Sequence, residues 1–448
     1  MNKRIILSLC LAASFSISAM AQHKQYEEEV AFWKERIKTL SSDEFGGRKP
    51  LTEYETKTIN YIADEFQKLG LQPANNGSYF QPVREISTLA RPDKNRIRVK
   101  AAKGSMDLSF PEDIVVWTHR GQKKMVVPNT DFVFVGFGIN APEYGWNDYE
   151  GIDVKGKIVI AMVNDPGFYD KDLFRGRNMT YYGRWTYKLE EAKRQGAAGA
   201  LVLHNTAAAS YGWNVCSTSH VNHNIALCSE DLNADALAFE GWLHEEAAKK
   251  LFEISGLNFE EVTNSAKKKG FKSFIMKAKS KVTMNVLEMN VGESHNVAAV
   301  LPGTDLKDEY IVCTAHWDHL GIGTPIEGDS IYNGAADNAS GTAALMVLAK
   351  KFQQLPVKPR RSIVFLAVTS EECGLLGSEG YCENPLFPLS KTAVNLNFDG
   401  TAPAMRTTGV TLRAAGKTDT DALVIAAAAA QGRSVRIVTE DPAGGYFR

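Results

Sequence analysis

Residues 310–319 of the chain, with the sequence YIVCTAHWDH, decide the fold. The first six form a short, mostly apolar run, which is typical of a strand covered on both faces of a sheet. His316 then ends the apolar run, and Asp318 follows two residues later. Ligands of open α/β sheets bind just beyond the carboxyl ends of the strands, so both side chains stand where a site is expected.

Further apolar runs on both sides of this strand complete an alternating pattern. Residues 296–301, 362–369 and 393–398 each predict a strand. Residues 340–355 predict a helix, with Ser340 as its N-cap and apolar side chains at helical spacing. Strand–helix–strand order predicts an α/β fold with a mixed, mainly parallel sheet covered by helices.

Acidic side chains follow the other strands, just as His316 follows the first. Glu371 and Glu372 come after the run 362–369, Asp399 comes after the last strand, and Asp337 precedes the helix. Each of them alone has an ordinary explanation as a turn residue or a solvated surface charge. Crowded together at one sheet edge they would repel one another, and a bound divalent cation would remove that penalty.

The predicted set of donors is rich in carboxylates and contains one imidazole. It suits zinc in a catalytic site and tolerates manganese or cobalt. A carboxylate can bridge two metals about 3.5–4 Å apart, and Asp337, on a loop between elements, is the natural bridge. One of Glu371 and Glu372 would bind metal and the other would hold the attacking water. Asp318 would orient the ring of His316.

Four motifs carry a resemblance to a known family. They are AHWDH at residues 315–319, DNASG at 337–341, EECGLLGS at 371–378 and NFD at 397–399. In this order they resemble the signature of metallopeptidase family twenty-eight, which includes bacterial leucyl aminopeptidases and glutamate-carboxypeptidase relatives. Residues 40–48 resemble the N-terminal helical region of that family.

The resemblance implies a role for each metal ligand. His316 and Asp399 would bind one zinc, Glu372 would bind the other, and Asp337 would bridge both ions. In the family a last ligand, a histidine, lies beyond the Asp399 motif. The sequence has no histidine after His319, which we expect to line the cleft, so we expect a truncated form of a longer protein with an incomplete second site.

The resemblance also implies the chemistry. Glu371 would act as general base on the attacking water, Asp318 would orient His316, and a cis peptide bond would follow Asp337. The expected activity is the removal of N-terminal residues from peptides by a zinc aminopeptidase. Three alternatives stay open: a carboxypeptidase or a glutaminyl cyclase on the same scaffold, and a catalytically inactive binding protein.

The chain is long enough for two folded units. We assign residues 22–110 and 283–448 to the catalytic domain and residues 111–282 to an inserted β-rich domain, because the block 130–205 resembles the protease-associated insert of many family members. Thr52 and Glu55 form a capping-box pattern at the start of an N-terminal helix that Gly70 would end. The lysine-rich residues 267–281 are predicted to be a solvated segment.

The pattern of the N-terminal residues predicts that the protein is exported. Lys3 and Arg4 precede a short apolar run, and Ala19-Met20-Ala21 supplies a cleavage signature, so residues 1–21 are predicted to be a signal peptide with cleavage after Ala21. The protein is therefore expected to be secreted or periplasmic. An oxidising compartment permits a disulfide, and Cys216 with Cys228 is the first pair to consider.

The charge composition of the chain limits the classes of partner that are expected. The formal net charge is −1, from 51 basic and 52 acidic residues, which favours neither nucleic acid nor an anionic membrane as partner. After the signal segment no stretch is long and apolar enough to span a membrane. Peptide substrates are the expected partners, and the oligomeric state is not predicted.

Overall fold

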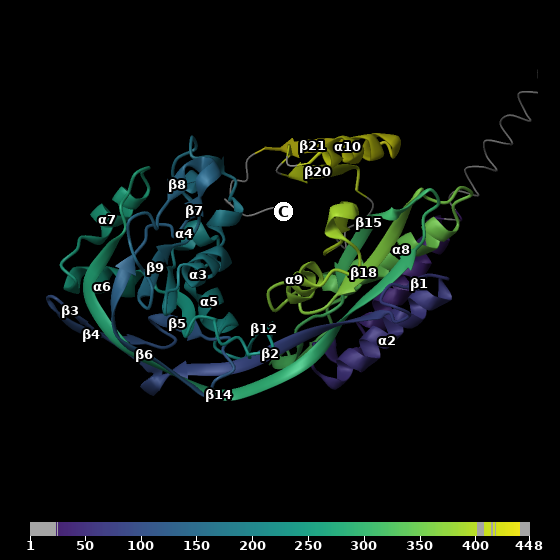
Figure 1. The fold of residues 1–448 in the computed structure, drawn as a ribbon. Coiled ribbons are helices and arrows are strands. Elements are labelled where there is room, and N and C mark those ends of the chain that lie inside the picture. The colour runs from purple at the N-terminus through teal and green to yellow at the C-terminus, as the bar shows by residue number, and fades with distance from the viewer. Residues whose placement is uncertain (1–23, 25, 401–406, 414, 417, 440–448) are drawn as a thin grey trace, which may run out of the picture. The chain divides into compact units, whose positions relative to one another are not determined.

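The computed structural model describes residues 24, 26–400, 407–413, 415–416 and 418–439. The predicted signal peptide, residues 1–21, lies outside them. The chain divides into two compact units, one of residues 1–85 with 292–403 and one of residues 86–291 with 404–448. Two strands, β2 (Phe80–Pro92) and β14 (Phe274–Leu301), contribute residues to both units (Figure 1).

The sheet of the first unit has the strand order β19-β15-β18-β14. Its central strand β15 (Leu306–His316) pairs in parallel with both β18 (Arg361–Val368) and β19 (Thr392–Asn397). Strand β18 pairs antiparallel with β14. The predicted mixed, mainly parallel α/β sheet is therefore confirmed for this unit. The smaller strands of the unit are β1 (Gln72–Pro73), β16 (Gly321–Ile326) and β17 (Asp329–Tyr332).

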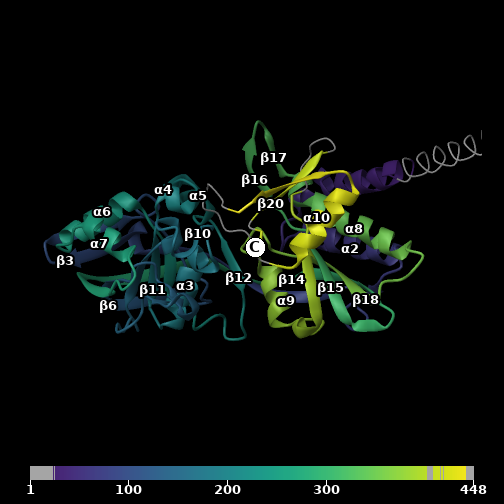
Figure 2. The same ribbon diagram turned by 90° about the horizontal axis from the view of Figure 1, so that it is seen from above.

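Helices cover both faces of this sheet (Figure 1, Figure 2). On one face α2 (Glu53–Lys68) and α8 (Ser340–Gln353) contact each other and enclose Phe365 of β18. On the other face α9 (Leu376–Glu383) contributes Tyr381 to the apolar cluster that contains Leu366, the next residue of the same strand. Neighbouring strand residues face opposite sides of the sheet, and helices cover both sides. This explains why the strands read as continuous apolar runs in the sequence.

The start of α8 differs from the prediction. Ser340 is the first helical residue and not the N-cap, because one wide π turn, Ala335–Ala339, precedes the helix. The Ser340 hydroxyl donates to the carbonyl of Ala336 (2.6 Å), and the Asn338 side chain accepts from the N–H of Gly341 (2.9 Å). Asn338 thus does the capping that was predicted for Ser340.

The start of α2 is where it was predicted, but the capping box is not formed. Thr52 precedes the helix without a side-chain cap, since its hydroxyl donates to the carbonyl of Lys49 (2.7 Å). The Glu55 carboxylate accepts from the N–H of Leu51 (2.6 Å). Gly70, with φ at 75°, follows the end of the helix as predicted.

The second unit contains three parallel strands that are buried except at Glu240. They are β9 (Ile158–Met162), β11 (Gly199–Leu203) and β13 (Phe239–Leu243), flanked by β6 (Lys124–Phe134) and β5 (Ile114–Trp117). The helix α3 (Trp185–Arg194) packs on β11. This unit is wider at both ends than the predicted insert, residues 111–282, and its identity as a protease-associated domain stays a prediction.

Shorter elements complete the second unit. They are β3 (Arg96–Ala101), β4 (Gly104–Ser109), β7 (Asn140–Ala141), β8 (Trp146–Asn147), β10 (Phe174–Arg177), α4 (Thr206–Ala209), α5 (Trp213–Ser219), β12 (Asn224–Leu227), α6 (Glu245–Ile254), α7 (Phe259–Ala266), β20 (Gly409–Arg413), α10 (Thr420–Ala430) and β21 (Ser434–Val438).

One smaller prediction for this unit is wrong, and one disulfide that was considered is not formed. Part of the lysine-rich segment 267–281 is not solvated loop, because β14 begins at Phe274 and buries alternate side chains such as Met276 and Ala278. Cys216 is a free, buried thiol, so the considered disulfide with Cys228 is not formed.

Within the described residues, no helix is both long enough and apolar enough to cross a membrane.

Candidate metal centre

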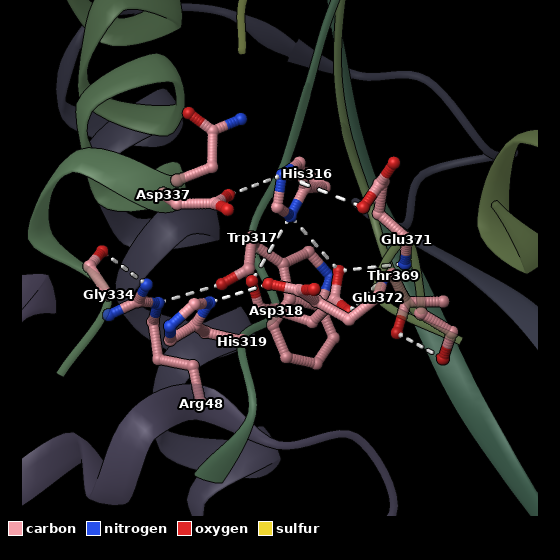
Figure 3. A network of polar contacts seen from close by, with 12 residues as sticks. Arg48, His316, Trp317, Asp318, His319, Gly334, Asp337, Thr369, Glu371 and Glu372 are labelled. Carbon is pink, nitrogen blue, oxygen red and sulfur yellow. Dashed lines mark hydrogen bonds and ion pairs between the residues drawn. The ribbon is translucent and has the colours of Figure 1, made fainter. Parts of the chain in front are cut away.

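The predicted site residues all come to one edge of the first unit, beyond the carboxyl ends of its parallel strands. His316 ends β15, and Glu371 lies three residues beyond β18. Asp399 lies two residues beyond β19, and Asp337 lies in the π turn before α8. The peptide bond between Asp337 and Asn338 is cis, as expected. In Figure 3, Asp337 and Glu371 approach His316 from opposite sides.

His316 is the centre of the first donor group. Its Nε2 atom lies 3.1 Å from Oδ1 of Asp337 and 3.4 Å from Oδ1 of Asp399. Oε2 of Glu371 is farther away, at 4.0 Å, and Glu371 belongs to no donor group. The ring is almost fully buried, whereas Asp337 and Asp399 are about half exposed, so the group opens to solvent on its acidic side.

A second donor group lies beside the first and shares Asp337 with it. It consists of His319, Asp337 and Glu372, and one ligand atom from each lies within 4.8 Å of the others. Nδ1 of His319 is 2.6 Å from Oε1 of Glu372. Asp337 therefore occupies the position of a bridge. The sequence prediction left His319 out, although it stands in the same motif as His316.

Asp318 contacts the backbone of Glu371 and Glu372 and the ring of His316. Its carboxylate is fully buried and accepts the backbone N–H groups of Glu371 (3.0 Å) and Glu372 (3.2 Å). Its main-chain oxygen lies 3.1 Å from Nδ1 of His316, and its Oδ1 lies 3.5 Å from the same atom. Because both oxygens only accept, the proton of a neutral His316 sits on Nδ1 and the lone pair of Nε2 faces the two aspartates.

Arg48 is the buried cation of the site. It donates to the main-chain oxygens of Leu40 (2.6 Å), Trp317 (2.8 Å), Asn333 (2.7 Å) and Gly334 (2.8 Å). It thereby joins the segment after β15 to the loop that leads to Asp337. The sequence prediction missed this role, because backbone carbonyl partners leave no pattern in the sequence.

Burial and the neighbouring charges shift the pKa values of His316, Glu371 and Arg48. Burial disfavours a charge on His316, but the hydrogen bond and charge of Asp318, with Glu371 and Asp399, outweigh it and raise the pKa of His316 to about 9. Burial raises the pKa of Glu371, His316 acts against this, and Asp318 and Asp399 add to it. Burial also lowers the pKa of Arg48 to about 10. The edge thus concentrates negative charge that attracts a cation.

These residues fit zinc. Each donor group offers one imidazole nitrogen and carboxylate oxygens, which are the ligands of catalytic zinc sites, and the two groups share one carboxylate. The Nδ1 contact of His316 with Asp318 is the outer contact that metal-binding histidines usually make. In the described part of the chain no other group of three such donors comes together.

Two histidines of the second unit, His220 and His223, make different contacts. His220 stacks on Trp117 with ring centroids 4.0 Å apart, and its Nδ1 contacts Asn224 (2.8 Å). His223 pairs with Glu288 (3.0 Å) at the surface. Neither belongs to a donor group among the residues that the structure describes.

We predict that Asp318→Asn lowers activity by about 10–100-fold, the usual effect of changing a partner behind a metal ligand. The new amide has one acceptor for two N–H groups, and its N–H₂ group would face one of them. The segment carrying Glu371 and Glu372 would therefore shift. Steady-state kinetics, with circular dichroism to confirm folding, check this. Unchanged kcat/KM in a folded variant would contradict it.

The chain was compared with known proteins. Residues 296–448 match the model of Peptidase family M28. A "Probable zinc metalloprotease" of Pyrenophora teres f. teres is 34% identical over 103 residues, 23% of this chain and 22% of the relative. "Aminopeptidase NAALADL1" of Rattus norvegicus is 32% identical over 128 residues, 27% of this chain and 16% of the relative. "Probable glutamate carboxypeptidase LAMP1" of Arabidopsis thaliana is 34% identical over 116 residues, 25% of this chain and 15% of the relative.

The alignments with these relatives span less than a quarter of each relative's length. They fall short of a whole-chain likeness, but the family model covers the segment that carries all four motifs. Residues 296–448 of this chain therefore belong to peptidase family M28.

Proposed function

We propose that the protein is a zinc-dependent exopeptidase that removes N-terminal residues from peptides. The observation that carries the proposal is the pair of donor groups that share Asp337, with Glu371 beside them and outside both. The family assignment of residues 296–448 supports the same reaction class.

Each residue then has a defined task. His316, Asp337 and Asp399 would hold one zinc ion, and Asp337 with Glu372 would hold another. Zinc bound there would polarise the peptide carbonyl and lower the pKa of water.

Glu371 would accept a proton from the attacking water and later donate it to the leaving amine, so that the C–N bond breaks without a net change at the carboxylate. Its raised pKa, due first to burial, makes it a stronger base than an exposed glutamate. The two N–H bonds to Asp318 fix the backbone from which Glu371 projects.

The charge of the site favours an amine over a carboxylate in the substrate. Asp337 and Asp399 are half exposed at the open side, where a substrate ammonium group would be attracted. A carboxypeptidase needs a cation for the terminal carboxylate. Arg48, whose charge reaches Asp318, Asp337 and Glu372, is fully buried and donates to four carbonyls instead.

A carboxypeptidase is the second candidate, because one of the relatives is a probable glutamate carboxypeptidase. Because the half-exposed Asp337 and Asp399 would repel a terminal carboxylate, a carboxypeptidase is a weaker candidate than an aminopeptidase. A glutaminyl cyclase and an inactive binding protein are outcomes of the same experiment.

We further propose that the protein is exported, on the basis of residues 1–21. N-terminal sequencing of the protein from periplasmic and culture fractions should give Gln22 as the first residue. Recovery of an intact Met1 from the cytosolic fraction alone would contradict export.

The substrate prediction is tested with a matched panel. The zinc-loaded protein should hydrolyse aminoacyl anilides with a free amine and not their N-acetylated forms. A chelator should abolish the activity, and added zinc should restore it. Full activity after metal stripping would contradict metal dependence. Cleavage only of blocked peptides with a free C-terminus would show a carboxypeptidase, and ring closure of N-terminal glutamine would show a cyclase. Binding without turnover would show a binding protein.

The role of Glu371 gives a separate prediction. Glu371→Gln should lower kcat by about 10²–10⁴-fold, the contribution of a general base, while the bound zinc per chain stays unchanged. Glu383→Gln, at the exposed end of α9, is the matched control and should retain full activity. Loss of zinc from the Glu371→Gln protein would instead make Glu371 a ligand.

A further inference from the structure

We propose that Glu85 is a positioning residue of the candidate metal centre, which acts through Ser370 on the turn at residues 369–377. That turn carries Glu371 and Glu372. The proposal rests on the proposed function and deepens it, because it concerns what holds the general base in place. Glu85 itself lies in β2, outside the family match.

The first support is the backbone conformation of Ser370, the residue directly before Glu371. Its φ is +50°, in the left-handed region that residues with a side chain rarely adopt. Ser370 is fully buried, and its carbonyl accepts the N–H of Leu376 (3.1 Å). The next two N–H groups of the chain both bond to Asp318. A strained backbone of this kind persists only where its surroundings hold it.

The second support is the burial of Glu85. Its side chain is fully buried, and neither carboxyl oxygen makes a hydrogen bond of ordinary length and angle within the described part of the chain. Burial raises the pKa of Glu85 to about 8, the side chain of Ser370 acts in the opposite direction, and the charges of Glu55 and Asp318 add to the rise. A buried carboxyl is costly unless it interacts with a polar group, and Ser370 is the group that stabilises it.

The third support is a chain of buried hydroxyl groups that begins at Ser370. Its Oγ lies 3.3 Å from Oγ1 of Thr369, and that atom lies 2.6 Å from Oγ of Ser294. All three residues are fully buried, so water does not complete their hydrogen bonds. Each hydroxyl has a single proton to donate, whereas a neutral carboxyl both donates and accepts. Glu85 therefore stands where the chain of hydroxyls gains a further donor.

The strand that bears Glu85 is also fixed to the same turn. Gln81, on the same face of β2, accepts a hydrogen bond from the side chain of Asn296 (3.0 Å). The Asn296 side chain in turn accepts the N–H of Thr369 (3.0 Å) and donates to the carbonyl of Gly377 (2.8 Å). Strand β2 is thereby linked to both ends of the turn, which sets the position of Glu85 beside it.

Paired variants test whether Glu85 acts through Ser370. Glu85→Ala should lower kcat by about 10-fold, a typical coupling within one hydrogen-bond network, and leave KM unchanged because the buried carboxyl does not contact substrate. Ser370→Gly removes the hydroxyl, and glycine tolerates the positive φ, so the same loss is expected. The double variant should be no less active than either single variant.

Glu85→Gln keeps hydrogen-bonding groups in the same place and should retain most of the activity. Losses that multiply in the double variant would show that the two residues act independently and would overturn the proposal. Wild-type kcat in Glu85→Ala would overturn it as well.

Hydrogen–deuterium exchange measures the turn directly and requires neither zinc nor turnover. The amides of residues 369–377 should exchange faster in Glu85→Ala and in Ser370→Gly than in the wild-type protein, because the turn loses a contact that holds it. Unchanged exchange in both variants would sink the proposal. A wild-type protein without zinc-dependent hydrolysis would contradict the proposed function instead, and the exchange experiment would still decide the role of Glu85.

Glu65→Ala is the matched control for a buried carboxyl of the same unit. Glu65 lies in α2 and pairs with Arg36 (2.6 Å) and Lys68 (3.0 Å), away from the turn. Its loss should lower the free energy of unfolding but leave kcat and the exchange of residues 369–377 unchanged. An equal effect of Glu65→Ala on both would show that the Glu85 variant acts only through global stability.

Discussion

Mutual repulsion among carboxylates is the constraint on which this site depends. Asp318, Asp337, Glu371, Glu372 and Asp399 lie at one sheet edge, some of them buried, where charge is costly. The protein offsets part of this cost with one buried guanidinium and with hydrogen bonds from backbone N–H groups to Asp318. The half-exposed Asp337 and Asp399 face Nε2 of His316, and the excess of carboxylates over cations at this edge suits a divalent cation.

The parallel strands explain why residues so distant in sequence meet. Along β15, His316 is level with Val368 of β18, and Thr314 is level with Asn397 of β19. All three strands therefore end at the same edge and in the same direction. Glu371 and Asp399 follow within three residues of those pairing positions, so the register of the sheet, more than any loop, sets their distance from His316.

The same register explains what the sequence could reveal. Apolar runs and the charged residues after them predicted the strands and brought His316, Glu371 and Asp399 together, because strand period and strand end are local properties. The helix cap at Asn338 was not predictable, since the π turn before α8 depends on contacts of that loop. The pairing of His319 with Glu372 joins residues 53 positions apart, so spacing alone did not indicate it.

The metal centre also needs residues from outside the family match. That match begins at residue 296, yet Arg48 comes from the N-terminal segment and bonds to the carbonyls of Trp317, Asn333 and Gly334. Without it, four carbonyls, that of Leu40 included, would lose a buried donor and the edge would lose its buried cation. The loop bearing Asp337 and the segment bearing His316 would then lose one of the links between them. The candidate metal centre is therefore built by residues from both sequence segments of the first unit.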